Sequence, residues 1–254
     1  HDDLMDASDT RRGKPAIHRR FENLHQDQVH AGLSEQFGTA AAILLGDLAL
    51  VQSDHMLHTS GISSTQLLAA LEIHDEMRIE LMAGQYLDVR EAGEKSFSVE
   101  RSLRIARFKS GKYSIERPLH LGVAIALGSP SKDNPLNWKL SEFGLPLGEA
   151  FQLRDDLLGI FGDPDITGKP AGDDLREGKR TVLMAMAMER TTDAGRTELI
   201  SYLGRPDLSH EIIEVLRGII IDSGAVESVE GLIEKLTYDA LQASQSHEIA
   251  PDAH

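Results

Sequence analysis

The sequence contains no cysteine, only one tryptophan, and an aromatic fraction of 5% among its 254 residues. Without cysteine the chain cannot form a disulfide, use a thiolate nucleophile or build a cysteine-based zinc site. This absence fits a cytoplasmic protein. The longest apolar runs, 40–45 and 182–188, are far shorter than the ~20 residues that cross a bilayer. We therefore expect no transmembrane segment.

Positive charge is also scarce. The chain carries 26 Lys and Arg against 41 Asp and Glu, which gives a formal net charge of −15. A protein this acidic has no overall field that attracts nucleic acid or an anionic membrane. Its hydrophobic fraction of 41% is ordinary for a folded globular domain and excludes a wholly disordered chain.

The periodicity of the apolar residues predicts helices throughout. Apolar side chains recur at three- and four-residue steps over 37–51, 73–81, 212–219 and 229–240, and no run alternates as a β-strand does. We expect an all-α protein of about eight or nine helices with one core. Breaks are predicted at 60–64, 144–146 and 204–209, and 162–178 is the longest irregular stretch.

An acidic pattern, DDLMD, opens the chain. On a helix Asp2 and Asp6 share a face, and carboxylates crowded in this way favour a hard cation such as Mg²⁺. The alternative is a solvated acidic helix end. Arg11 and Arg12 follow at once and suit an anion such as phosphate, although ion pairs to Asp6 and Asp9 would explain them equally well.

A second acidic pattern, FQLRDDLLG, places Asp155 four residues after Phe151 and three before Leu158. We therefore expect Asp155 on an apolar stripe, where an ionised carboxylate is costly unless a cation neutralises it. The glycines and lysines of the following stretch, 162–180, suit a lid that closes on phosphates and has little order without ligand. The alternative is a solvated connector.

Two weaker motifs lie between the acidic patterns. In FKSGKYS, Lys109 and Ser110 could contact a phosphate. In GQYLD, Gln85 and Asp88 lie three residues apart on one helix face, which favours an amide–carboxylate pair that serves helix packing.

Taken in order, the motifs DDLMD with SDTRRGKPAIH, LLGD, GQYLD, FKSGKYS, FQLRDDLLGIFGD and TGKPAGDDLREGKRT resemble those of the polyprenyl (trans-isoprenyl) diphosphate synthase family. The resemblance covers nearly the whole chain. It implies an isoprenoid-synthase-type all-α bundle around a central cavity, with residues 1–254 forming a single domain, and a homodimer.

The resemblance also implies a role for individual residues. Asp2, Asp6 and Asp155 match the ligands of Mg²⁺, of which three ions would bind the diphosphate of an allylic substrate. The residue matching Arg12 contacts isopentenyl diphosphate. Residues that lie around the allylic diphosphate match Arg11, Lys109, Gln152, Lys169 and Lys179. Catalytic residues match Lys109, Ser110 and Gln152, of which Ser110 and Gln152, with backbone carbonyls, would stabilise the carbocation.

The implied reaction condenses isopentenyl diphosphate with an allylic prenyl diphosphate to give a longer product. A class I terpene cyclase shares the fold, but its second metal motif normally differs from Asp155-Asp156. A non-catalytic partner subunit of a synthase is the other alternative, although such subunits usually lose the acids or lysines that this chain keeps. Product length and the preferred allylic substrate cannot be inferred from this sequence.

Two positions depart from the family pattern. Gly159 stands where many members carry a third Asp, and Ser110 stands where Thr is usual. Because the first Asp of the motif is the usual metal ligand, we expect Gly159→Asp to change turnover little. Helices precede DDLMD in the family and a basic tail often ends the chain, so we expect the native protein to extend beyond both ends.

Overall fold

The computed structural model describes residues 1–94, 96–129, 134–168 and 172–245. Two compact units divide the chain: residues 1–61 with 161–173, and residues 62–160 with 174–254. Both are helical, which confirms the predicted all-α class. The described residues contain more helical segments than expected, α1 to α13 and a π-helix η1, because several of them are a single turn long. The predicted single domain over 1–254 stays a prediction.

The first unit begins with α1 (Asp2–Met5) and a small hairpin of β1 (Thr10–Arg11) and β2 (Lys14–Pro15). The helices α2 (Ile17–Asp27), α3 (Ser34–His58) and α8 (Pro164–Thr167) complete it. The hairpin was not expected from the sequence. Its turn, Arg12-Gly13, has positive φ angles of 52° and 70°, so an arginine takes the place that Asn usually occupies in such turns.

The helices α2 and α3 pack closely against each other. A side chain at Gly38 of α3 would collide with the carbonyl of His18, so glycine is required for this approach. The rings of Phe37 and His25 lie 4.9 Å apart at the same contact. By length and composition α3 could cross a membrane, but one such helix is weak evidence for a span, and α3 carries Asp47 and Asp54 within its length.

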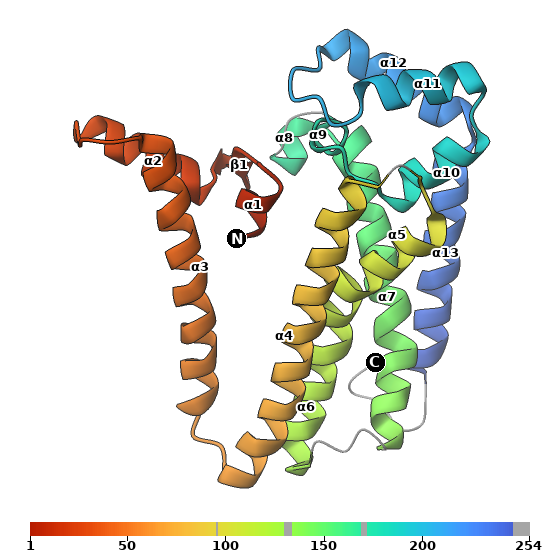
Figure 1. Cartoon of the computed structure of the whole chain (residues 1–254). Coiled ribbons are helices and arrows are strands. Elements are labelled where there is room, and N and C mark those ends of the chain that lie inside the picture. Colours follow the sequence, from red (N-terminus) through yellow and green to blue (C-terminus); the bar gives the residue numbers. More distant parts are fainter. Residues whose placement is uncertain (95, 130–133, 169–171, 246–254) are drawn as a thin grey trace. The chain divides into compact units, whose positions relative to one another are not determined.

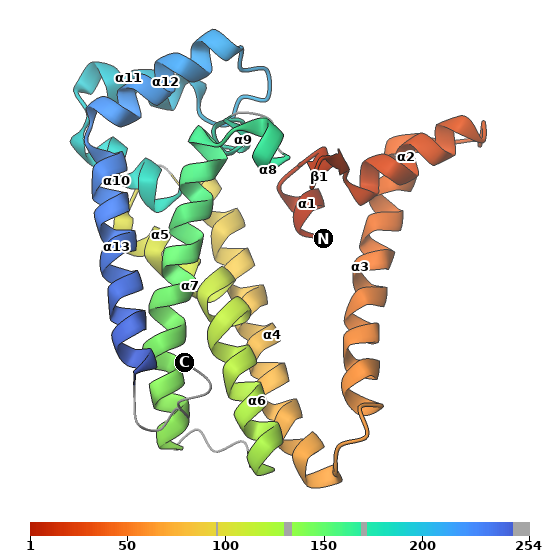
Figure 2. The same ribbon diagram turned by 180° about the vertical axis from the view of Figure 1, so that it is seen from behind.

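The second unit contains the longest helices and the rest of the chain. In Figures 1 and 2, α7 (Pro135–Phe161) lies between α13 (Ala225–Ser244) on one side and α4 (Ser64–Ala92) with α6 (Arg117–Leu127) on the other. The remaining elements are α5 (Val99–Ala106), η1 (Arg107–Glu116), α9 (Asp173–Glu177), α10 (Val182–Arg190), α11 (Asp193–Tyr202) and α12 (His210–Asp222).

The core of this unit is centred on α10. Six of its nine residues are buried, so this helix is apolar on all sides, as expected for a helix surrounded by others. The largest side chains that are fully buried with it include Leu153 and Ile160 of α7, Leu216 of α12 and Val229 of α13. The site residues on α7 therefore stand on the most firmly packed part of the unit.

Helix α7 contradicts the predicted break at 144–146. It continues through Pro146, although proline removes one backbone hydrogen bond from a helix. Gly144 and Gly148 are both buried and lie against the backbone of η1. Tertiary packing along this face outweighs the local preference for a break.

Other predicted boundaries are confirmed. The side chain of Ser63 caps α4 and forms a capping box with Gln66, and Ser209 caps α12. The long irregular stretch at 162–178 contains two short helices, α8 and α9, among its described residues. In α9, Leu175 is fully buried and its carbonyl accepts a hydrogen bond of 2.8 Å from the Gly204 amide. The expected lack of order without ligand stays a prediction.

A buried histidine joins α6 to α7. His120 is 6% exposed, and its Nε2 donates to the carbonyl of Asn137 at 3.0 Å. Its Nδ1 then accepts from Arg117 at 3.3 Å. Arg117 also binds Glu76 of α4 at 3.1 Å. Burial lowers the pKa of His120, although the nearby Glu116 carboxylate opposes this shift.

This lowered pKa makes stability depend on pH. The unfolded chain takes up a proton on the imidazole near pH ~6.5, whereas the folded protein does so only at lower pH. We therefore expect the free energy of unfolding to fall as the pH drops below ~6.5, by at most ~1.4 kcal/mol per pH unit for this one group. Denaturant unfolding at several pH values should show a shallower loss for His120→Gln. An equal slope in wild type and variant would contradict this account.

Candidate functional site

The first acidic motif forms the short helix α1 and the residue after it. Asp6 ends α1, and its amide donates to the carbonyl of Asp2 at 2.9 Å, so the two acids lie one turn apart as predicted. Nη1 of Arg11 lies 3.2 Å from Oδ1 of Asp3 and 3.9 Å from Oδ2 of Asp2. The motif therefore places a guanidinium beside its carboxylates, as a combined cation and anion site requires.

The alternative to anion binding by Arg11 and Arg12 was that they form ion pairs with nearby acids. It paired them with Asp6 and Asp9, but Asp9 binds Arg19 at 2.6 Å, and Arg11 turns to Asp2 and Asp3. Arg12 lies exposed in the hairpin turn. This turn is held to another motif of the same unit, because the amide of Gly13 donates to the carbonyl of Gly168 at 3.1 Å. Lys169 lies outside the described residues.

On α7 the two acids of the second motif differ in burial. Asp155 is exposed, together with Phe151 at 61% and Leu158 at 45%. The expectation that Asp155 needs a cation to offset burial is therefore wrong, because the stripe on which it lies is not buried. The exposed side chain of Asp155 does not carry the desolvation cost of a buried carboxylate.

Asp156 is the acid that is buried. It is 6% exposed and lies near Asp174, which is 5% exposed. Burial, and then the neighbouring Asp174 carboxylate, raise the pKa of Asp156 to about 8. A hydrogen bond of 2.8 Å from Gln152 partly opposes the shift. Asp156 is thus a buried acid with a raised pKa, whereas Asp155 beside it is exposed to solvent.

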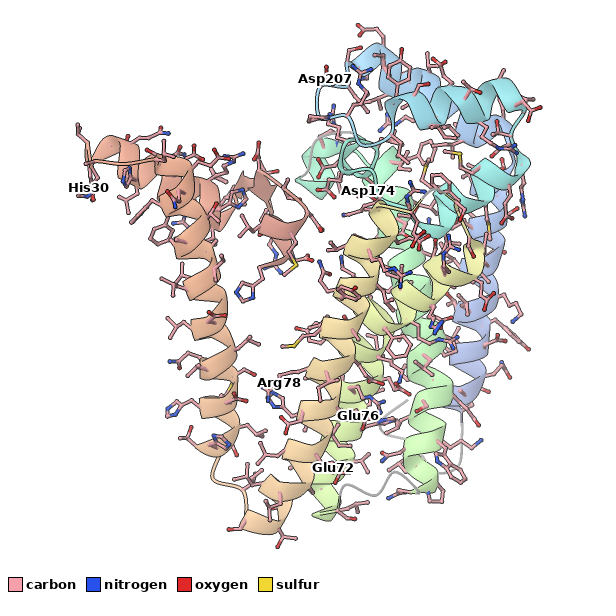
Figure 3. The ribbon with its side chains drawn as sticks, viewed as in Figure 1. His30, Glu72, Glu76, Arg78, Asp174 and Asp207 are labelled. Atoms are coloured by element: carbon pink, nitrogen blue, oxygen red, sulfur yellow. The ribbon has the colours of Figure 1, made fainter. Side chains whose placement is uncertain are left out.

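The missing third acid of this motif has a steric explanation. A Cβ at Gly159 would overlap the carboxylate of Asp174, which extends from α9 toward α7 (Figure 3). Asp174 therefore brings an acidic group from the loop into the space beside position 159. The expectation that Gly159→Asp changes turnover little stays a prediction, but the new side chain would have to displace the Asp174 carboxylate.

Lys109 and Ser110 lie on the π-helix η1, a helix type that is rare and frequently found at functional sites. Nζ of Lys109 contacts Oδ2 of Asp88 at 2.7 Å. Ser110 donates to Oε1 of Gln152, and Gln152 donates in turn to Asp156. The structure thus brings together the GQYLD, FKSGKYS and FQLRDD motifs within one unit.

Two glycines make this arrangement possible. A Cβ at Gly84 of α4 would lie 2.6 Å from the backbone nitrogen of Lys109, and one at Gly148 of α7 would overlap Gly111 of η1. Each glycine is followed one turn later by the polar residue that holds η1, Asp88 on α4 and Gln152 on α7. Asp88 therefore binds a predicted site residue and does more than serve helix packing.

Lys179 is held by acids of the neighbouring helix α9. Its Nζ lies 2.7 Å from Oε2 of Glu177 and 3.3 Å from Oδ1 of Asp174. Neither acid was singled out from the sequence, although both stand in the quoted motif TGKPAGDDLREGKRT. A signal was available, since a lysine that must remain in a partly buried site needs a nearby carboxylate.

The acidic side chains of the predicted site suit Mg²⁺, but they do not surround one ion with protein ligands alone. Among the described residues no group of three or more His, Cys, Asp or Glu side chains is arranged to hold one metal ion. Mg²⁺ is commonly bound by one or two carboxylates, with water and phosphate oxygens as the remaining ligands. The pair Asp2 and Asp6 on one unit and Asp155 on the other each fit that pattern.

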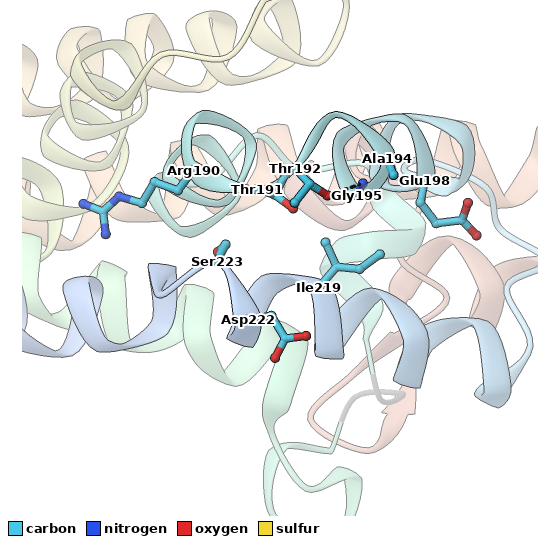
Figure 4. A pocket seen from close by; sticks show the side chains of 9 residues that line it. All are labelled: Arg190, Thr191, Thr192, Ala194, Gly195, Glu198, Ile219, Asp222 and Ser223. Carbon is cyan, nitrogen blue, oxygen red and sulfur yellow. Dashed lines mark hydrogen bonds between the residues drawn. The ribbon is translucent and has the colours of Figure 1, made fainter.

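A cavity of about 410 Å³ lies elsewhere in the second unit (Figure 4). It is bounded by the start of α11 and the end of α12, and Arg190, Thr191, Glu198 and Asp222 are among its lining residues. None of the predicted site residues lines it. Its lining mixes charges of both signs and identifies no ligand class.

Residues 1–219 match the polyprenyl synthetase family. The chain is 34% identical over 233 residues to a geranylfarnesyl diphosphate synthase of Aeropyrum pernix, which covers 91% of this chain and 65% of that protein. It is 32% identical over 208 residues to a geranylgeranyl diphosphate synthase of Mycobacterium tuberculosis, covering 81% of this chain and 52% of that protein. The chain thus spans between half and two thirds of these relatives.

A solved structure is similar over the whole chain. The geranylgeranyl pyrophosphate synthase of Corynebacterium glutamicum, in complex with isoprenyl diphosphate and magnesium, is 44% identical with a TM-score of 0.94. The comparison covers 100% of this chain and 70% of that one.

The contact between Gly159 and Asp174 can be tested by substitution. We expect Gly159→Ala and Gly159→Asp to lower the free energy of unfolding by about 1–3 kcal/mol, because a side chain is forced into filled space. The aspartate also places a second carboxylate against that of Asp174. Denaturant unfolding measures both effects.

Gly231→Ala in α13 is the matched control, because a Cβ there meets nothing within 4 Å. It should be neutral or stabilising by up to ~1 kcal/mol. Adding Asp174→Ala to Gly159→Asp should recover part of the loss. If Gly159→Ala is as stable as the control, the steric account is wrong.

Proposed function

This chain belongs to the polyprenyl synthetase family, and on that premise we propose that it is a trans-prenyltransferase. It condenses isopentenyl diphosphate with an allylic prenyl diphosphate to give a longer trans-polyprenyl diphosphate. The observation that carries the proposal is the convergence on η1: Lys109 and Ser110 are held by Asp88 and Gln152, so three family motifs form one arrangement within the second unit. The hairpin of Arg11 and Arg12 supports it from the first unit.

We assign the basic residues to the two diphosphates and the acidic residues to Mg²⁺. Arg11, Lys109, Lys169 and Lys179 bind the diphosphate of the allylic substrate, and Arg12 binds that of isopentenyl diphosphate. Asp2, Asp6 and Asp155 hold Mg²⁺, of which we propose three ions. When bound, Mg²⁺ takes up the negative charge that develops on the leaving diphosphate.

Carbon–oxygen bond cleavage leaves an allylic carbocation, and the double bond of isopentenyl diphosphate attacks it. The proton that is then lost passes to the released diphosphate. Dipoles of Ser110 and Gln152 stabilise the positive charge, and their orientation is prepared before the reaction because Gln152 is fixed at both ends, by Ser110 and by Asp156. Such preorganised polar groups need no rearrangement as charge develops.

We also propose a homodimer in the cytoplasm. Apolar side chains of α3 remain exposed along its length, including Leu44 at 67%, Val51 at 60% and Met56 at 70%. Exposed apolar surface of this extent typically marks an interaction site. A chain without cysteine fits a reducing compartment.

The reaction itself distinguishes the proposed function from its alternatives. Purified protein is incubated with Mg²⁺, isopentenyl diphosphate and an allylic diphosphate, and the products are identified by mass spectrometry. A longer prenyl diphosphate supports the proposal and reports the product length. A free hydrocarbon would indicate a cyclase, and no turnover would indicate a non-catalytic subunit.

Asp155→Asn tests the metal assignment. We expect turnover to fall by roughly 10²-fold or more, as for the loss of one preorganised electrostatic contact. The melting temperature should change little, because Asp155 is exposed and no packing depends on its charge.

The control is Asp239→Asn on α13, a half-buried acid outside every motif whose carboxylate pairs with Lys235 at 3.0 Å. It removes the same charge and should leave turnover unchanged. Near-wild-type turnover of Asp155→Asn at saturating Mg²⁺ would remove Asp155 from the metal site.

A further inference from the structure

His1, the residue immediately before the first acidic motif, connects α1 to α3. Its backbone carbonyl accepts hydrogen bonds from the amides of Leu4 and Met5, at 3.1 and 3.0 Å, and so begins α1. Its side chain reaches α3, where Nε2 donates to the carbonyl of Ile43 at 2.9 Å and lies 3.4 Å from Oδ1 of Asp47. One residue therefore both starts the acidic helix and attaches it to its neighbour.

Gly46 provides the space for this side chain. A Cβ at position 46 would overlap the imidazole of His1, so the ring lies directly against the backbone of α3. Glycine inside a helix costs about 0.5–1 kcal/mol relative to alanine. Here Gly46 lies near the middle of a 25-residue helix, where no turn or chain end requires glycine. The feature of the structure that favours glycine at position 46 is the contact with the His1 ring.

The helix α1 depends on such an attachment. It has only four residues, and isolated helices shorter than ~12–15 residues are marginal in water. The carboxylates of Asp2 and Asp6 keep their spacing only while α1 is formed.

We infer that His1 is a positioning residue for the metal-binding acids, seated on Gly46 and oriented by the Ile43 carbonyl and Asp47. This inference rests on the proposed function, in which Asp2 and Asp6 hold Mg²⁺. It also gives the motif LLGD, residues 44–47, a role that its resemblance alone does not supply. The role is one of orientation, because a pair as exposed as His1 and Asp47 contributes little to stability.

The test compares Gly46→Ala, His1→Ala and the double variant in the full chain. Binding is measured by titration with Mn²⁺ in the presence of inorganic diphosphate, with free Mn²⁺ followed by electron paramagnetic resonance. Each single variant should raise the half-saturating Mn²⁺ concentration by about tenfold, the lower end of the range for groups that orient metal ligands. The double variant should be no worse than either single one, because Gly46→Ala acts by displacing the His1 ring.

Two controls separate orientation from folding. Gly231→Ala is the same substitution inside another helix with open space around it, and it should leave Mn²⁺ binding unchanged. The melting temperature of Gly46→Ala should equal or exceed that of wild type, since alanine favours the helix, while metal binding weakens. His1→Gln, which retains a donor for the Ile43 carbonyl, should bind Mn²⁺ more tightly than His1→Ala.

Asp2→Asn distinguishes a failure of this inference from a failure of the proposed function. If Asp2→Asn weakens Mn²⁺ binding while His1→Ala and Gly46→Ala do not, only the positioning role is overturned. Additive effects of the two substitutions also overturn it, because they would then act independently. If Asp2→Asn binds Mn²⁺ as wild type does, the metal assignment fails and the positioning role fails with it.

Discussion

The close approach of η1 to α4 and α7 is the constraint on which the second unit depends. Gly84 and Gly148 remove the side chains that would hold these backbones apart. Asp88 and Gln152, each one turn further along, then reach Lys109 and Ser110. A side chain at either glycine would move η1 and with it both polar contacts. The same packing accounts for the continuity of α7 through Pro146, because Gly144 and Gly148 on either side of this proline lie against the backbone of η1.

The acids of this unit fall into two electrostatic classes. Asp155 is exposed to solvent. Asp156 and Asp174 are buried next to each other, and burial, followed by the charge of the neighbouring Asp174 carboxylate, raises the pKa of Asp156 to about 8. Two neighbouring residues with identical side chains thus differ in their electrostatics, because Asp156 is buried beside Asp174 and Asp155 is not buried.

The burial of the lysines in this unit also determines their contacts. Lys109 and Lys179 are both less than a quarter exposed, and each contacts a carboxylate, Asp88 or Glu177, at 2.7 Å. A lysine held in this way loses little conformational freedom when an anion binds, since its side chain is already ordered. Lys109 and Lys179, two of the lysines that the resemblance assigns to diphosphate, are therefore held by carboxylates before any substrate is present.

The sequence by itself determined the helical class, the family, the breaks at 60–64 and 204–209, and the one-turn spacing of Asp2 and Asp6. These features depend on residues within a few positions of one another, where helix geometry alone relates them. Only the tertiary structure showed that Asp156 is the buried acid and that a side chain at Gly159 would overlap Asp174. It also showed that Lys109 pairs with Asp88 and that α7 continues through Pro146. Those outcomes depend on contacts between residues 15 to 42 positions apart, and no local pattern records how closely two backbones will approach.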